Sequence, residues 1–370
     1  MIVRAPKAGF RAALLTLPLL ALLSACETVL AANAAKAHPP QGKLVDVSSG
    51  PGKASRRIQI DCRGSGSPTV VFQAGGDMLG ALAWSPVLDR VAQSSRACAY
   101  SRAGILWSDP ASGEFKPEEV ARDLHSALVA AGERPPYLLV AHSRGGLYNM
   151  IFAGLYRNEI AGLVFADSSH PDQEKRYSEA GLSTGDYVSA SQEIGLAFGW
   201  TGLLRLVPYP TDTSIDATVK AFYPKSAEAN AREARQRNAT LAAAGGYRDL
   251  ENWPVIVLAR ELPAETRARE TQDAKNGYLL GAGGVPPDTS PAARRESIWR
   301  DLQVDLATWS SHARLEVVPN SNHAFFFFQP EVIVAAVKEA LAAARLEQRS
   351  LPQDGAKGSG LRARTLEGSP

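Results

Sequence analysis

The stretch Leu138-Leu139-Val140-Ala141-His142-Ser143-Arg144-Gly145-Gly146 decides how the rest of the chain is interpreted. An apolar run typical of a buried strand is followed at once by a serine and by a helical pattern. In a strand–serine–helix turn of the G-x-S-x-G type, the serine lies on a sharp, strained bend with its hydroxyl exposed. The residues two before and two after the serine must be small, and here they are Ala141 and Gly145. The stretch therefore predicts that Ser143 is a nucleophile.

Length and composition describe the kind of molecule that carries this turn. The chain has 370 residues, of which 45% are hydrophobic, and its 40 basic and 38 acidic side chains give a net charge of +2. This apolar content excludes a disordered chain. The interleaved charges lack the basic stripe that nucleic-acid-binding surfaces carry, so no nucleic-acid partner is expected.

Short apolar runs alternate with amphipathic helical patterns along most of the chain. The clearest helical patterns cover residues 118–131, 145–156 and 330–346. Strands that alternate with helices predict an α/β fold with a mostly parallel sheet covered on both faces. The predicted strands are Arg57–Cys62, Thr69–Gln73, Ala97–Tyr100, Tyr137–Ala141, Gly162–Ala166, Val255–Ala259 and Leu315–Val318.

One interval interrupts this alternation and divides the core into two parts. Residues 171–250 contain helical stretches, at 186–206 and 226–244, and no convincing strand. We interpret the interval as a helical cap inserted into a core made of residues 46–170 and 251–346, the alternative being a second domain unrelated to the chemistry. Residues 347–370 lack periodicity and are expected to be a disordered tail.

The N-terminus has the features of an export signal. Arg4, Lys7 and Arg11 precede an apolar run at 12–23, which is shorter than the roughly 20 residues needed to span a bilayer. Leu23-Ser24-Ala25-Cys26 resembles the lipobox of bacterial lipoproteins, which implies a signal peptide at 1–25, a lipid-modified Cys26 and a flexible tether at 26–45.

The resemblance implies a protein that faces the periplasm and is anchored to a membrane by its N-terminal lipid, and Glu27 after the cysteine resembles sequences sorted to the outer membrane. The alternative is an ordinary secretory signal cut near Ala31 or Ala32, which would leave a soluble periplasmic protein.

The remaining cysteines are an even pair. In an oxidising periplasm Cys62 and Cys98 are expected to form a disulfide, whereas in a cytosolic chain they would be two buried thiols. No histidine pair lies near them in the sequence, which argues against zinc, and no metal or dinucleotide cofactor is expected.

Several segments beyond the serine turn resemble the α/β-hydrolase superfamily, over nearly all of residues 57–346. Thr69–Gly76 is similar to its third strand and oxyanion loop, and Tyr100–Gly104 (YSRAG) to the Y-D-R-A-G segment of an esterase-like branch. Leu163–Gln173 and Pro319–Pro330 are similar to the end of its sixth strand and to its histidine loop. The family's strand order implies that the second and fourth strands are neighbours, with Cys62 beside Cys98.

The resemblance also implies partners for Ser143, because a serine hydroxyl needs a base, and the base needs an acid that orients it. His323 follows a predicted strand and precedes the last helix, which is where this fold carries its base. Asp167, at the end of the sixth strand, is the preferred acid. Glu261 and Glu265, after the seventh strand, are the alternative acids.

An oxyanion hole needs two backbone donors aimed at the developing negative oxygen. The N–H of Arg144, next to the nucleophile, and by resemblance the N–H of Gly76 are the expected donors. The side chain of Arg144 is expected to pair at the surface.

Together these features imply a carboxylesterase-like serine hydrolase that cleaves small or medium esters through an acyl-enzyme. The same side chains would serve an amide or iminopeptide hydrolase or an acyltransferase, so the expected partner is a small-molecule ester or amide. A lipoprotein that keeps the fold as a non-catalytic binding module is a third interpretation. The sequence does not specify the oligomeric state.

Overall fold

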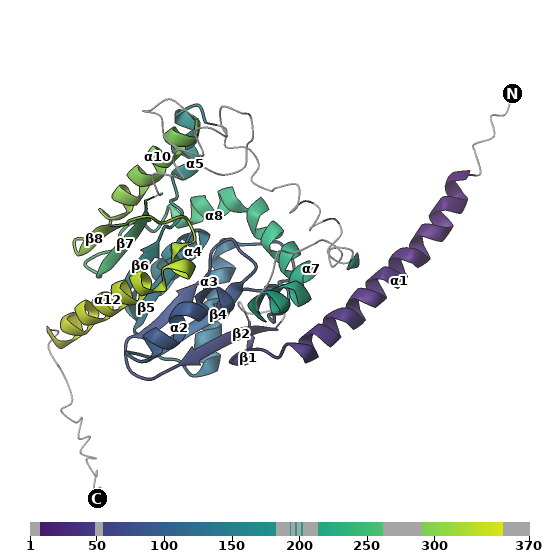
Figure 1. Cartoon of the computed structure of the whole chain (residues 1–370), viewed down its shortest axis with the longest axis horizontal. Helices are drawn as coiled ribbons and strands as arrows, with labels where there is room; N and C mark the ends of the chain where they lie inside the picture. The colour runs from purple at the N-terminus through teal and green to yellow at the C-terminus, as the bar shows by residue number, and fades with distance from the viewer. Residues whose placement is uncertain are drawn as a thin grey trace, which may run out of the picture.

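The computed structural model describes residues 8–48, 55–182, 214–261 and 291–350, together with residues 193, 197, 201 and 202. Its centre is an eight-stranded sheet in the order β1-β2-β4-β3-β5-β6-β7-β8 (Figure 1). The pairs β1–β2 and β2–β4 are antiparallel and all other pairs are parallel. The strands are β1 (Lys43–Val47), β2 (Arg56–Arg63), β3 (Thr69–Gln73), β4 (Ala97–Ser101), β5 (Tyr137–His142), β6 (Ile160–Ala166), β7 (Val255–Arg260) and β8 (Ala313–Val318).

Helices cover both faces of the sheet, which confirms the predicted α/β architecture. Side chains of α3, α4 and α8 share one apolar core with the sheet, and those of α2 and α12 share a second core with its other face. The helices are α1 (Ala8–Ala37), α2 (Ser85–Ala92), α3 (Pro117–Ala131), α4 (Arg144–Leu155), α5 (Gln173–Glu179), α7 (Ser214–Arg235), α8 (Arg237–Ala244), α10 (Pro291–Leu306), α11 (Phe325–Phe328) and α12 (Pro330–Ser350), with 3-10 turns η1 (Gly80–Trp84) and η2 (Arg157–Glu159).

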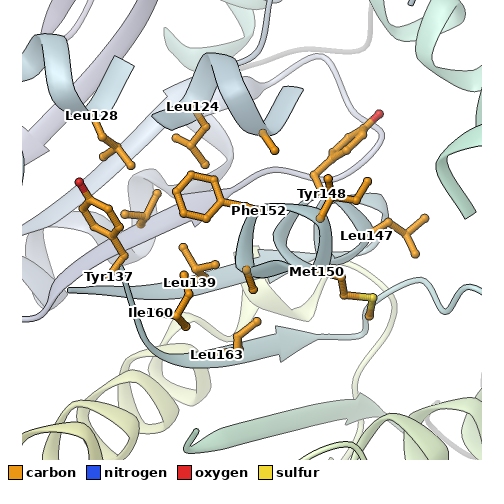
Figure 2. Close-up of a cluster of buried hydrophobic side chains, with 14 of the residues drawn as sticks. Leu124, Leu128, Tyr137, Leu139, Leu147, Tyr148, Met150, Phe152, Ile160 and Leu163 are labelled. Atoms are coloured by element: carbon orange, nitrogen blue, oxygen red, sulfur yellow. The ribbon is translucent and has the colours of Figure 1, made fainter. Parts of the chain in front are cut away.

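The core around β5 shows why these segments fold together. Figure 2 shows side chains of α3, α4, β5 and β6 meeting in one cluster, in which Tyr137, Leu139 and Phe152 are fully buried. β5 and β6 are buried along their whole length, as expected for strands covered on both faces. Burying each large apolar side chain contributes about 1.5–3 kcal/mol, so this cluster fixes α4 directly against the strand that precedes it.

All seven predicted strands are present, as β2 to β8. The segment at 26–45, expected to be a flexible tether, is instead mostly part of a helix and a strand. Residues up to Ala37 belong to α1, and the chain enters β1 at Lys43. β1 pairs along β2 at the sheet edge and buries Val45 and Val47. An edge strand of five residues has too few apolar positions to stand out in the sequence.

The described part of the interval at 171–250 lies between β6 and β7 and is helical, comprising α5, α7 and α8. α8 packs on α4. The predicted helical stretch at 186–206 falls almost entirely outside the described residues, as do Glu265 and residues 351–370.

α1 extends away from the body of the molecule, with its C-terminal end near α7 (Figure 1). Cys26 is exposed on this helix, whereas Ala34 is buried. Among the described residues, no helix combines the length and the apolar character needed to cross a membrane.

A disulfide joins Cys62 and Cys98, as predicted. The two residues lie directly opposite each other in the antiparallel pair of β2 and β4, with their Cα atoms 4.0 Å apart. The bond therefore ties two neighbouring strands at one end of the sheet and closes a loop with a sequence separation of 36.

Replacing both of these cysteines by serine is expected to lower the free energy of unfolding by up to about 4 kcal/mol, because the unfolded chain regains the loop's conformational entropy. Urea denaturation at pH 7 measures the loss. Cys26→Ser is the matched control and leaves the urea midpoint unchanged. A double variant with the wild-type midpoint would contradict a stabilising role for the bond.

Candidate active site

Ser143 lies on the tight turn between β5 and α4. Its backbone has φ 51° and ψ −127°, a conformation that favours glycine and costs about 1–3 kcal/mol for other residues. Its N–H donates to the carbonyl of Ala166 at 3.3 Å, and its carbonyl accepts from the N–H of Ser169 and of Gly146, each at 3.0 Å. The neighbouring strand and the first turn of α4 therefore hold the bend in place.

Two glycines after the serine allow this bend. A Cβ on Gly145 would lie 2.6 Å from the carbonyl oxygen of Ala74, and one on Gly146 would lie 1.7 Å from Oγ of Ser168. Any larger residue at either position would push α4 away from β3 or β6. Close approach of the backbone thus explains the small residue that the sequence pattern required at position 145, whereas Gly146 leaves room for the side chain of Ser168.

His323 follows β8 and lies beside the serine. Its Nε2 is 3.0 Å from Oγ of Ser143, and its Nδ1 is 2.6 Å from Oδ2 of Asp167. The three side chains, which come from three different strand ends, form one continuous hydrogen-bonded row. In such a row the imidazole can accept the hydroxyl proton while the carboxylate orients the ring.

Asp167 is fully buried and accepts several hydrogen bonds. Trp299 of α10 donates Nε1–H to Oδ1 at 2.8 Å, and the guanidinium of Arg260 donates to Oδ2. Burial raises the pKa of Asp167, but the bond from His323 and the charge of Arg260 outweigh it and hold the pKa of this carboxyl well below its usual value. Asp167 is therefore a carboxylate at neutral pH.

Glu261, one of the two alternative acids, is not part of this row. The backbone N–H of Glu261 donates to Oγ of Ser321 at 3.0 Å, and no contact of its carboxylate with His323 is present in the described structure. Glu265 lies outside the described residues. The structure thus brings Asp167, and not Glu261, to the imidazole.

Arg260 and Trp299 are site residues that sequence reasoning missed. Arg260 ends β7, directly before Glu261, and forms an ion pair with Glu296 of α10 at 2.7 Å. Its position at the end of a strand next to a candidate acid was a signal that could have been used. Trp299 gave no such signal, because α10 itself was not predicted.

The segment Ala74-Gly75-Gly76, called here the oxyanion loop, follows β3 and borders the serine. A Cβ on Gly75 would lie 3.2 Å from Cβ of Ser143, so the loop backbone passes directly beside this serine. Arg102, after β4, donates to the carbonyls of Ala74 and Gly75, both at 2.7 Å. The structure therefore places both expected donors, the N–H groups of Gly76 and Arg144, on segments next to Ser143.

The side chain of Arg144 is not a surface group, contrary to expectation. It is 15% exposed and pairs with Glu233 of α7 at 3.1 Å. It also donates to Oδ1 of Asn230 at 3.3 Å. The sequence could not show this pairing, because Glu233 is 89 residues away along the chain.

His142 supports the loop that carries His323. It is buried, its ring is stacked on Phe326, and its Nε2–H donates to the backbone carbonyl of His323 at 2.7 Å. Burial, followed by repulsion from His323, lowers the pKa of His142 to about 3. His142 is therefore neutral at physiological pH and acts as a fixed donor.

The described residues include one group of three side chains close enough to share a metal ion, namely Cys62, Cys98 and Glu133. The two sulfur atoms are bonded to each other in the disulfide, so the carboxylate of Glu133 is the remaining metal ligand in this group.

Comparisons with known proteins define the class. A profile of the alpha/beta hydrolase family matches residues 58–336. The chain is 24% identical over 326 residues to the probable transporter efuK of Hormonema carpetanum, an alignment that covers 81% of this chain and 42% of that protein. The chain spans less than half the length of the curated relatives it matches.

Solved structures share the fold. An esterase from Thermogutta terrifontis superposes with a TM-score of 0.53 at 17% identity, covering 82% of this chain and 99% of that one. Est816, described as an N-acyl homoserine lactone degrading enzyme, superposes with a TM-score of 0.51 at 18% identity. The superposition covers 77% of this chain and 96% of the Est816 chain. The fold, the turn at Ser143 and the profile agree, and the chain belongs to the alpha/beta hydrolase family.

The lowered pKa of His142 predicts a pH dependence of stability. An unfolded histidine binds a proton below about pH 6.5 while the folded one stays neutral, so stability is complete above pH 6.5 and is lost as pH falls toward 3. Between pH 7 and pH 5 the loss from this residue is at most about 2 kcal/mol. His142→Gln keeps a donor and removes the titration.

Urea denaturation of both proteins at pH 7 and pH 5 tests this prediction. The wild type is expected to lose more stability than His142→Gln over this interval. Equal losses would show that His142 is protonated in the folded protein.

Proposed function

We propose that this protein is a serine hydrolase that cleaves small or medium carboxylic esters through an acyl-enzyme. The observation that carries the proposal is the row of hydrogen bonds from Oγ of Ser143 through His323 to Asp167. The strained turn at Ser143, which exposes the hydroxyl beside the oxyanion loop, supports the same chemistry.

In the proposed reaction, Oγ of Ser143 attacks the ester carbonyl carbon as Nε2 of His323 takes the hydroxyl proton. The Asp167 carboxylate holds the Nδ1–H and stabilises the imidazolium that forms. The negative oxygen of the tetrahedral intermediate accepts hydrogen bonds from the N–H groups of Gly76 and Arg144.

The intermediate then collapses, and the alcohol leaves with the proton from His323. Water, deprotonated by the same imidazole, attacks the acyl-enzyme, and the carboxylic acid leaves as Oγ of Ser143 regains its proton.

We further propose that the helices between β6 and β7 act as a cap over this site. The contacts of Asn230 and Glu233 with Arg144, next to the nucleophile, support this role.

Replacing the nucleophile tests the proposal. Ser143→Ala is expected to lower kcat for p-nitrophenyl butyrate by about 10⁴-fold or more, since the nucleophile is lost. A fluorophosphonate probe is expected to label the wild type and not the variant. A panel of esters of increasing chain length beside aminoacyl amides then identifies the bond that is cleaved.

Variants of Asp167 and Glu261, the two candidate acids that the structure describes, provide a matched test and control. Asp167→Asn is expected to lower kcat by about 10⁴-fold, because the imidazole is no longer held in the correct tautomer. Glu261→Gln is expected to leave kcat unchanged. A wild type that neither hydrolyses any of these substrates nor reacts with the probe would instead favour a non-catalytic binding module.

We also propose that the protein is exported and anchored to a membrane, facing the periplasm, through a lipid on Cys26. The exposed position of Cys26 and the disulfide, which suits an oxidising compartment, support this proposal. Stable anchoring needs more than one acyl chain, so the modified residue would carry several.

In a bacterial host, Cys26→Ser is expected to shift the protein from the membrane fraction to the soluble periplasmic fraction. Mass spectrometry of the wild-type N-terminal peptide is expected to show an acylated Cys26. An unmodified N-terminus near residue 31 or 32 would contradict lipidation and indicate ordinary secretion.

A further inference from the structure

A buried carboxylate on the insertion helix α7 joins two arginines that flank the oxyanion loop. Glu233 is 3% exposed, and Arg102, its main partner, is 4% exposed. Arg102 donates Nε–H to Oε1 at 2.7 Å and Nη2–H to Oε2 at 2.9 Å, and Arg144 reaches the same Oε2 at 3.1 Å. The three side chains form one ion network between the insertion and the core.

The geometry of the peptide bond makes this network relevant to catalysis. In a trans peptide the C=O and the following N–H point in opposite directions, and the bond between Gly75 and Gly76 is not among the cis bonds of the described chain. Arg102 holds the carbonyl of Gly75 at 2.7 Å, so the N–H of Gly76 must point away from Arg102. The N–H of Gly76 is one of the two proposed oxyanion donors.

The second arginine fixes the loop at the next residue. A Cβ on Gly76 would lie 2.8 Å from Nη2 of Arg144, so the guanidinium lies directly against the Gly76 backbone. The N–H of Arg144 is the other proposed donor. Each donor segment is therefore in contact with an arginine that ends on Glu233.

The charge and burial of Arg102 explain why the carboxylate of Glu233 is needed beside it. Burial raises the pKa of Glu233, but the charges of Arg102 and Arg144 outweigh it and keep the pKa of this carboxyl below its usual value. In the described structure Glu233 is the one carboxylate hydrogen-bonded to Arg102, whose other acceptors are the neutral carbonyls of Ala74 and Gly75. Asp77 interacts with Arg102 through its charge, with no hydrogen bond between the two side chains. A buried guanidinium that has lost its hydrogen-bonded carboxylate is costly and would reorient, which would release the oxyanion loop.

We propose that Glu233 is a positioning residue, which sets the direction of the oxyanion donors through Arg102 and Arg144 and so makes the insertion helix part of the hydrolytic machinery. This inference rests on the proposed hydrolase function. The inference goes beyond that function because Glu233 touches neither Ser143 nor His323 in the structure. Glu233 would act on the transition state through the side chains of Arg102 and Arg144.

Glu233→Gln tests the inference, with Glu133→Gln as the matched control. Glu133 is a similarly buried carboxylate, 9% exposed, that binds Arg96 through two hydrogen bonds of 2.6 and 2.9 Å, away from Ser143. With p-nitrophenyl butyrate, Glu233→Gln is expected to lower kcat by about 10- to 100-fold, somewhat less than the loss of one oxyanion donor. KM is expected to stay within about threefold, because the affected donors act on the transition state.

Glu133→Gln is expected to lower the melting temperature as Glu233→Gln does while kcat stays within about twofold of the wild type. A Glu233→Gln protein with wild-type kcat, or an equal loss of kcat in the control, would overturn the inference. Because the wild type is assayed and labelled at Ser143 in parallel, an inactive wild type would instead reject the proposed function itself.

Arg102→Lys gives a second route that does not depend on the folding of Glu233→Gln. A lysine keeps the charge but lacks the planar fork that binds two carbonyls and a carboxylate together. We expect it to lower kcat to a similar extent with little change in KM, and unchanged kcat in this variant would also overturn the inference.

Discussion

The backbone conformation of Ser143 is the constraint on which the rest of the site depends. A residue at φ 51° and ψ −127° stays there only where its surroundings determine its position several times over. Here the last residue of β6, the first turn of α4 and the backbone after β6 each contribute a hydrogen bond. The same contacts leave the hydroxyl directed toward His323, so the strain and the proposed chemistry have one structural cause.

Much of the fold could be predicted because parallel strands covered on both faces appear as continuous apolar runs. β3, β5 and β6 are fully buried, and each of them is present at the predicted place. β1 was missed because a five-residue strand at the sheet edge buries only two of its apolar side chains. α10 was missed because Arg294, Arg295 and other polar residues make up half of its length.

The candidate site could be predicted only to the extent that strand ends mark it. Ser143, His323 and Asp167 each follow a strand, so a resemblance to known strand order was enough to name them. The choice between Asp167 and Glu261 depended on side-chain direction, which the sequence does not contain. Trp299 and Glu233 lie on helices 132 and 131 residues away from their partners Asp167 and Arg102, and only tertiary folding connects them.

The ion pair between Arg102 and Glu233 limits how this fold can diversify. One fold can host many functions when the segments that line its site differ, and exchange of an inserted segment is one way to change such a site. In this protein such an exchange would remove Glu233 and leave the buried guanidinium of Arg102 without its hydrogen-bonded carboxylate. A chimera built with a foreign insertion would therefore have to bring an acidic residue to the same point, or replace Arg102 at the same time.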